Sequence, residues 1–252
     1  MTKKPLPTAD RELTACEACP RLAGFLAQAR TTHPDYFCRP APPFGDPNPK
    51  LLIVGLAPGF HGANRTGRPF TGDYAGVLLY ETLHAFGYAS RPVSESADDG
   101  LELIGCRITN AVKCVPPENK PETSEIRQCN GYLKAELEAL PPGTAILALG
   151  LIAHKAVLMA LGLKQSAYAF SHGAEHLLPL PPGEGWGEGA TADQGQPRRR
   201  APLPRPSPLP RGGRGTGLRL FDSYHCSRYN TNTNRLTPDM FRAVFRQIQG
   251  GH

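Results

Sequence analysis

Short apolar runs alternate with amphipathic segments along most of the chain, a pattern that predicts strands and helices in alternation. Four runs have the length and aliphatic composition of buried strands, namely 51–55, 108–114, 144–150 and 218–224. Four segments repeat apolar residues at helical spacing, namely 73–87, 122–140, about a dozen residues after 150, and 237–249. This order predicts an α/β fold: a three-layer α/β/α sandwich with a central, mostly parallel four-stranded sheet.

Chain length and helix-boundary signals agree with this order. The 252 residues suffice for one domain of ordinary size, so we expect a single domain over residues 1–252. Gly87 marks a helix end, and Thr237-Pro238-Asp239 has the cap and first-turn proline of a helix start. Ligands of parallel α/β sheets bind beyond the carboxyl ends of the strands, so we expect the functional site in the loops after Val54, Asn110 and Ser223.

One segment, residues 179–217, breaks the pattern. Its 39 positions hold nine prolines and nine glycines. Such a composition buries too little apolar surface to offset the entropy of ordering, so we expect a disordered insertion within the domain. The run Arg198-Arg199-Arg200 would suit a basic DNA-binding tail, but a surface insertion without a catalytic role is the favoured interpretation.

Charge and targeting signals narrow the class of protein only modestly. The formal net charge is +6, and residues 179–217 contribute half of it through six arginines and three acidic residues. The remaining excess is weak evidence for a nucleic-acid partner. No apolar stretch follows the N-terminal lysines and no run of about 18 apolar residues occurs, so we expect a soluble, cytoplasmic protein without a secretory signal or membrane span.

The seven cysteines indicate a ligand set, because thiols in a reducing compartment are more often ligands or core residues than disulfides. Two residues separate Cys16 from Cys19, and fourteen separate Cys114 from Cys129. Four thiolates so arranged suit a [4Fe–4S] cluster and a tetrahedral zinc ion about equally well. A redox pair at Cys16 and Cys19 is disfavoured because no strand precedes it, and Cys106 is interpreted as a small buried hydrophobe.

The loop over residues 55–73 is rich in glycine and directly follows a predicted strand. Its five glycines let other molecules approach the backbone, its amides with Arg65 and Arg68 would hold a phosphate, and Phe70 would stack on a planar base. The spacing matches neither a Walker loop nor a dinucleotide fingerprint, so we expect no nucleotide cofactor. From these residues alone, an anion or nucleotide site and a purely structural loop remain equally open.

Three segments, each after a predicted strand, together resemble the signatures of the type B, or family 5, uracil-DNA glycosylases. The first reads G-L-A-P-G…N-R-T-G-R-P-F-T-G-D over 55–73, and the others are I-T-N-A-V-K-C-V-P-P-E-N-K-P over 108–121 and D-S-Y-H-C-S-R-Y-N-T-N-T over 222–233. The resemblance covers residues 12 to about 247 outside the insertion. It implies a monofunctional repair enzyme that hydrolyses the N-glycosidic bond of uracil, and of other deaminated bases such as hypoxanthine, and leaves an abasic site.

The resemblance also assigns expected roles to residues. It implies that a [4Fe–4S] cluster is held by the four cysteines Cys16, Cys19, Cys114 and Cys129. In the base pocket it implies Ala57 and Gly59 as wall residues, and Phe70 as the stacking platform for a flipped base. Asn110 is expected to read the base edge with its amide, and His225 to donate to the charge that develops on the leaving base.

The residue that positions the attacking water is less evident from the sequence. Other uracil-DNA glycosylase families carry an acid or amide early in the first segment, where this chain has Ala57, as is typical of type B. We expect Asn64 to help position the water, because related enzymes place an acid near there. Asp73 is the alternative, although it would also cap the next helix. Cys226 replaces the proline expected after the family's histidine, which loosens the loop around His225.

Three other interpretations stay open. A type A, or family 4, glycosylase shares the cluster and fold, but Leu56 and the N-T-N-T run over 230–233 argue against it. A non-catalytic iron–sulfur protein that binds damaged DNA predicts a cluster without base release. A nucleotide hydrolase would need an acidic metal site beside the loop, where Asp73 stands nearly alone. We expect a monomer that acts on uracil-containing DNA and associates with the nucleoid through it.

Overall fold

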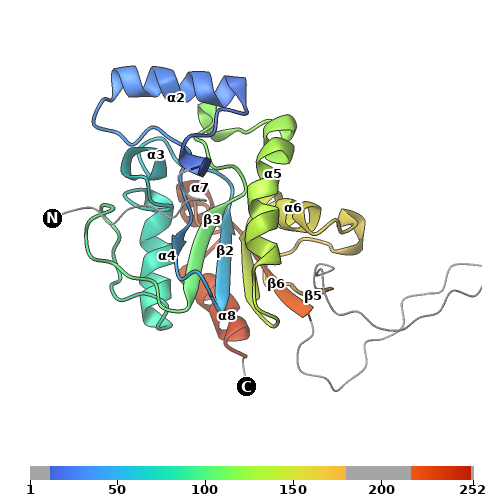
Figure 1. The fold of residues 1–252 in the computed structure, drawn as a ribbon. Helices are drawn as coiled ribbons and strands as arrows, with labels where there is room; N and C mark the ends of the chain where they lie inside the picture. The colour runs from blue at the N-terminus through green and yellow to red at the C-terminus, as the bar shows by residue number, and fades with distance from the viewer. Residues whose placement is uncertain (1–11, 180–216, 251–252) are drawn as a thin grey trace, which may run out of the picture.

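The structure is a computed structural model that describes residues 12–179 and 217–250, and its strands form one six-stranded sheet (Figure 1). The sheet order is β1-β3-β2-β4-β6-β5. The strands are β1 (Phe44–Gly45), β2 (Leu51–Gly55), β3 (Cys106–Asn110), β4 (Ala145–Leu149), β5 (Glu175–Pro179) and β6 (Gly217–Ser223). β3, β2, β4 and β6 run parallel, and β1 and β5 pair antiparallel at the two edges.

The predicted α/β fold with a mostly parallel sheet is confirmed, and the four predicted strands form its parallel part. The sheet has two more strands than predicted, because β1 is only two residues long and β5 buries only Leu178, so neither leaves a clear pattern. The strand predicted at 108–114 lies instead at Cys106–Asn110. The apolar residues that follow are buried by loop packing, which made the run look longer than the strand.

Each of the four predicted helices has a counterpart among the described residues. They are α4 (Tyr74–Ala85), α5 (Thr123–Glu138), α6 (Leu151–Ala160) and α8 (Pro238–Ile248). The additional helices are α2 (Pro20–Thr32), α3 (Ala63–Thr66) and α7 (Arg228–Asn232), with 3-10 turns η1 (Pro117–Asn119) and η2 (Gln165–Ala167). α2 buries only a narrow stripe of Leu22, Leu26 and Ala29, so its apolar periodicity is weak.

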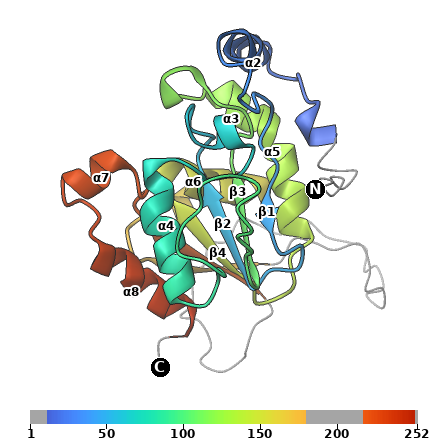
Figure 2. The same ribbon diagram turned by 90° about the vertical axis from the view of Figure 1, so that its left-hand side faces the viewer.

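Helices cover both faces of the sheet, because successive residues of a strand point to opposite sides. Leu51 and Ile53 of β2 pack in the core beneath α4 and α8, whereas Leu52 and Val54 pack in the core beneath α5 and α6. Figures 1 and 2 show these helix pairs on either side of the sheet, with α2 and α3 near one end of it. Because β3, β2, β4 and β6 run parallel, their carboxyl ends lie at the same end of the sheet.

Most of the predicted insertion, residues 180–216, lies outside the described residues. Its two boundary residues are described: Pro179 ends β5 and Gly217 begins β6, and the two are paired. The segment therefore connects two neighbouring antiparallel strands, at the opposite end of β6 from Ser223. Within residues 12–179 and 217–250, no helix combines the length and apolarity needed to cross a bilayer.

Candidate active site

A cavity of about 440 Å³ opens where β2, β3 and β6 end. Its walls come from four separate segments of the chain, namely Leu56–Gly59, Phe70 with Asp73–Ala75, Asn110 with Asn119, and His225 with Ser227–Arg228. The three loops predicted to carry the functional site are thus brought together at the carboxyl edge of the sheet. The volume is within the range of cavities that hold small molecules or a single base.

The floor of the cavity is packed around Gly55, the last residue of β2. A β-carbon at Gly55 would lie 2.4 Å from Asn110 Oδ1 and 2.7 Å from Phe70 Cζ, so only glycine leaves room for both side chains. Asn110 is 2% exposed, and among the described residues its Oδ1 finds no hydrogen-bond partner. A buried amide oxygen without a partner in a cavity wall is available to a ligand that donates a hydrogen bond.

Phe70 and His225 form one side of the cavity. Their ring centroids lie 5.8 Å apart with an angle of 31° between the planes. Burial lowers the pKa of His225 to about 4, so the imidazole is neutral at physiological pH. A neutral imidazole offers one N–H donor without a fixed positive charge. Asn230 Nδ2 donates to the His225 carbonyl at 2.8 Å and so braces the loop, even though Cys226 stands where a proline was expected.

Asp73 also lines the cavity and is the acidic residue of its wall. Its Oδ1 accepts from the Gly76 amide at 2.8 Å and caps α4, while burial raises its pKa despite that bond. A β-carbon at Gly62 would lie 2.4 Å from Oδ2, so the glycine-rich loop approaches the carboxylate closely. The sequence left two roles open for Asp73, a helix cap and a group that positions water. The side chain caps α4 and also lines the cavity.

Three residues of the glycine-rich loop with predicted roles do not line the cavity. Arg65, predicted as a phosphate ligand, is exposed, and its Nε donates to the His61 carbonyl at 2.8 Å. Asn64, predicted to position water, is fully buried away from the lining; its Nδ2 donates to the Phe60 carbonyl at 3.4 Å and contacts Cys38 Sγ at 3.7 Å. Arg68, predicted as a phosphate ligand, is also buried and pairs with Asp99 at 2.6 Å. All three predictions rested on residue type, whereas the fold of the loop turns the side chains of Asn64 and Arg68 inward.

Several lining residues were given no individual role by the sequence, among them Asn119, Tyr74 and Arg228. Asn119 sits in the second signature segment with φ of +56°, a conformation that asparagine tolerates better than most residues. Tyr74 and Arg228 form the outer wall, and the Arg228 guanidinium lies 4.9 Å from the centroid of the Tyr74 ring. Asn119 and Arg228 lie in the quoted segments and Tyr74 directly follows the first of them, but nothing local distinguished these residues from surface residues.

The four cysteines expected to act as ligands line one separate cavity of about 70 Å³. Cys16 and Cys19 approach it from the N-terminal segment, and Cys114 and Cys129 from the loop after β3 and from α5. The Lys113 amide donates to Cys129 Sγ at 3.3 Å. Residues separated by about one hundred positions thus present four thiols to one space, which fits a metal centre with thiolate ligands.

The cysteine cavity and the first cavity share a packed wall. Leu22 and Leu26 of α2 form one apolar cluster with Cys114 and Cys129, and Ala57 and Phe60 of the glycine-rich loop pack against that cluster. Ala57 in turn lines the first cavity. Anchoring of the N-terminal segment at the cysteines therefore supports the loop that follows β2.

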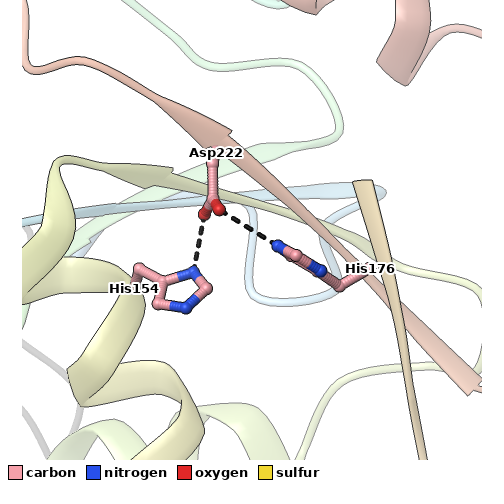
Figure 3. Close-up of side chains that lie close together, drawn as sticks. All are labelled: His154, His176 and Asp222. Carbon is pink, nitrogen blue, oxygen red and sulfur yellow. Dashed lines mark hydrogen bonds and ion pairs between the residues drawn. The ribbon is translucent and has the colours of Figure 1, made fainter. Parts of the chain in front are cut away.

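A polar cluster separate from both cavities lies where α6, β5 and β6 meet (Figure 3). His154 Nδ1 lies 2.7 Å from Asp222 Oδ1, and His176 Nε2 lies 3.1 Å from Asp222 Oδ2. The other ring nitrogen of His154 bonds the Tyr168 carbonyl at 3.0 Å. Each carboxylate oxygen has its own imidazole partner, so the buried charge is satisfied by hydrogen bonds and the cluster ties three elements together.

Comparison with known proteins agrees with this geometry. The family model described as the uracil DNA glycosylase superfamily matches residues 42–249. The type-5 uracil-DNA glycosylase of Thermus thermophilus is 42% identical over 242 residues, which are 94% of each chain, and that of Pyrobaculum aerophilum is 37% identical over 93% of this chain and 88% of its own. A type-4 uracil-DNA glycosylase of Pyrobaculum aerophilum is 39% identical, but over 44% of this chain and 50% of its own.

Proposed function

The chain belongs to the type-5 branch of the uracil-DNA glycosylase superfamily, and on that premise we propose that it excises uracil from DNA by hydrolysing the N-glycosidic bond. One observation carries the proposal: a neutral imidazole, a buried unpaired amide oxygen and an aromatic ring surround the same cavity. The type-4 alternative is disfavoured, because the type-4 relatives match over 44–66% of the chain whereas the type-5 relatives match over 93–97% of it.

Binding of the target base begins with its extrusion from the duplex, at a cost of a few kcal/mol. In our proposal the flipped base enters the cavity and stacks on Phe70. The unpaired Oδ1 of Asn110 accepts the N3–H of uracil, and the amide nitrogen of the same side chain donates to the neighbouring carbonyl. Ala57 and Gly59 supply wall without polar groups. We propose that this lets the pocket accept hypoxanthine as well, since fewer fixed groups are left unpaired by a different base.

Departure of the base requires stabilisation of the negative charge that develops on it. The N–H of neutral His225 donates to that charge, and such a donor is commonly worth about 10²–10³-fold in rate. Because burial keeps the imidazole uncharged, the donor is positioned without attracting a counterion or a phosphate in its place. When the departing uracil anion is stabilised in this way, the attacking water needs less activation by a proton-accepting side chain.

Asp73 is the group that we propose positions the water. It lines the cavity, and its raised pKa makes the carboxylate a better proton acceptor than an ordinary surface aspartate. Gly59 and Gly62 keep the loop close to its Oδ2, which limits the space in front of this oxygen to a small molecule. Asn64 is better assigned to the support of the loop, since its side chain is buried outside the cavity.

We further propose that the four cysteines hold a [4Fe–4S] cluster. Zinc with four thiolates at about 2.3 Å would bring the sulfurs within about 3.8 Å of one another. In the part of the chain that the structure describes, the group with three ligand atoms all within 4.8 Å is His154, His176 and Asp222, not the cysteines. Since the four thiols form no such compact group and line a cavity instead, the larger cofactor is favoured. When bound, it would crosslink the N-terminal segment to α5.

Each residue of the cavity wall comes from one chain, so the proposed activity needs no second copy, and we propose a monomer. The insertion joins β5 and β6 at the end of β6 remote from His225, which supports the interpretation that it has no catalytic role. DNA containing uracil is the proposed partner in the cytoplasm.

The test is base release from a labelled duplex containing one uracil, with holoenzyme purified without oxygen. Wild type is expected to give alkali-sensitive abasic product, and His225→Ala and Asn110→Ala are expected to lose most of this activity. His84→Ala is the matched control, because His84 is exposed on α4 and does not line the cavity. Tight binding of the duplex by wild type without any product would refute the proposal and support a DNA-damage-binding protein instead.

A further inference from the structure

Phe70 adopts a backbone conformation that phenylalanine rarely takes. Its φ is +54°, in the left-handed region that favours glycine. A non-glycine residue stays there only when its surroundings hold it, and such conformations gather at functional sites. Since the Phe70 ring forms a wall of the base cavity, whatever holds this backbone also sets the position of the wall.

The residue that holds one side of Phe70 is Arg68. Its side chain is only 5% exposed, and its Nη2 donates to Asp99 Oδ2 at 2.6 Å and to Ser94 Oγ at 2.7 Å. Its Nε donates to Thr71 Oγ1 at 2.9 Å, and the guanidinium lies 4.8 Å from the centroid of the Phe44 ring. The guanidinium therefore binds the residue after Phe70 and a second loop at the same time, which uses its planar fork of donors.

Asp99 anchors that second loop. Its carboxylate accepts from the amides of Glu95 at 2.8 Å and Leu101 at 2.9 Å, in addition to Arg68. Burial alone would raise the pKa of Asp99, but the Arg68 guanidinium and these amides hold it well below its ordinary value. Asp99 thus remains a carboxylate that fixes both its own loop and Arg68.

The other side of Phe70 is fixed by α4. The Tyr80 hydroxyl donates to the Pro69 carbonyl at 2.8 Å, and the helix approaches so closely at Gly76 that a β-carbon there would lie 1.9 Å from the Phe70 carbonyl oxygen. Contacts with α4 therefore hold the peptides before and after Phe70 from one side, and Arg68 holds Thr71 from the other, so the strained torsion persists while both sets of contacts remain.

We propose that Arg68 and Asp99 form a positioning pair that keeps Phe70 in its left-handed conformation and thereby sets the stacking wall of the base cavity. Neither residue lines the cavity, so both act through Phe70 rather than on the DNA. The proposal rests on the proposed function in one respect, because the rate of base release is the quantity that reports the position of the Phe70 ring.

The test is a double-mutant cycle with Phe70→Ala, measured as the single-turnover rate of uracil release. Arg68→Lys keeps a charge beside Asp99 but cannot bond Thr71, Ser94 and Asp99 together, and Asp99→Asn keeps the shape of the partner without its charge. Each is expected to lower the rate about tenfold when Phe70 is present, and less than about twofold when residue 70 is already alanine. Val244→Ala, at a buried core position of α8, serves as the control for a loss of stability alone.

Equal losses of rate with and without Phe70, or a lowered melting temperature with an unchanged rate, would overturn the proposal. A crystal structure of Arg68→Lys gives an answer that does not depend on activity: we expect Phe70 to leave the left-handed region, and an unchanged φ would again overturn the proposal. Absence of uracil release by wild type would defeat the proposed function, while this structure would still decide whether Arg68 positions Phe70.

Discussion

Gly55→Ala tests the packing on which the base cavity depends. The added β-carbon would lie 2.4 Å from Asn110 Oδ1 and 2.7 Å from Phe70 Cζ, and ordinary contact requires about 1 Å more in each case. Gly55 is buried at the end of β2, where its backbone is paired in the sheet, so the glycine itself cannot retreat. The amide and the ring must therefore move.

The size of the effect follows from that displacement. Overpacking of a tight core costs about 1–3 kcal/mol in the free energy of unfolding, whereas a shift of about 1 Å in a catalytic group can cost about a hundredfold in rate. We therefore expect Gly55→Ala to fold, with a modestly lower melting temperature, and to release uracil about a hundredfold more slowly in single turnover.

Two glycines provide matched controls for the same chemical change. A β-carbon at Gly24 on α2 or at Gly131 on α5 would meet no atom within 4 Å. Gly24→Ala and Gly131→Ala should keep the wild-type rate and gain stability, since alanine is favoured over glycine in a helix by about 1 kcal/mol. If folded Gly55→Ala released uracil as fast as these controls, the assignment of Asn110 and Phe70 to the base pocket would be wrong.

The remaining predictions concern protonation, the interior polar cluster and the cysteines. Because burial raises the pKa of Asp73 and the proposed mechanism needs its carboxylate, the rate of uracil release should fall as the pH drops through a value above the ordinary aspartate range. His225, with a pKa of about 4, should cause no change of rate near neutral pH. A titration near neutral pH in the pH–rate profile would contradict the assignment of His225. Asp222→Ala should lower the free energy of unfolding in urea by about 3–5 kcal/mol, because the buried His154 imidazole and the half-buried His176 imidazole lose their carboxylate partner. A loss below about 1 kcal/mol would show that the cluster is not a structural tie. Cys129→Ser should lose most of the roughly four iron atoms per chain expected in holoenzyme, whereas Cys106→Ala, outside the cysteine cavity, should retain them; equal iron in both variants would exclude Cys129 as a ligand.

The central part of the fold was predictable because it depends on local patterns. The buried run Leu51–Gly55 and the three other apolar runs predict parallel strands. The loops that follow parallel strands lie at the same end of the sheet. Those loops carry the three signature segments, so the parallel arrangement was enough to place Asn110 and His225 at the same end of the sheet. The edge strand β5 was missed because only Leu178 of its residues is buried, which leaves no alternation to detect.

The roles of individual loop residues were decided by tertiary packing. Asn64 and Arg68 have the residue types of a water-positioning and a phosphate-binding group, yet both are buried, Asn64 under the loop and Arg68 against Asp99. Asp73 has the sequence context of a simple helix cap, yet it also faces the cavity. Residue type states which bonds a side chain can make, but in an irregular loop no periodicity tells which way it points.

The sequence by itself thus determined the four parallel strands of the sheet, the end of those strands at which the site forms and the candidate set of functional groups. Only the tertiary structure decided which members of that set share a cavity, because this depends on contacts between segments far apart in the chain. Cys16 and Cys129 come to one space only when α2 docks beside α5, and Phe70 keeps its conformation only when Asp99 reaches Arg68. Such contacts leave no local signal, because the residues next to one partner in the sequence give no information about which distant residue it contacts.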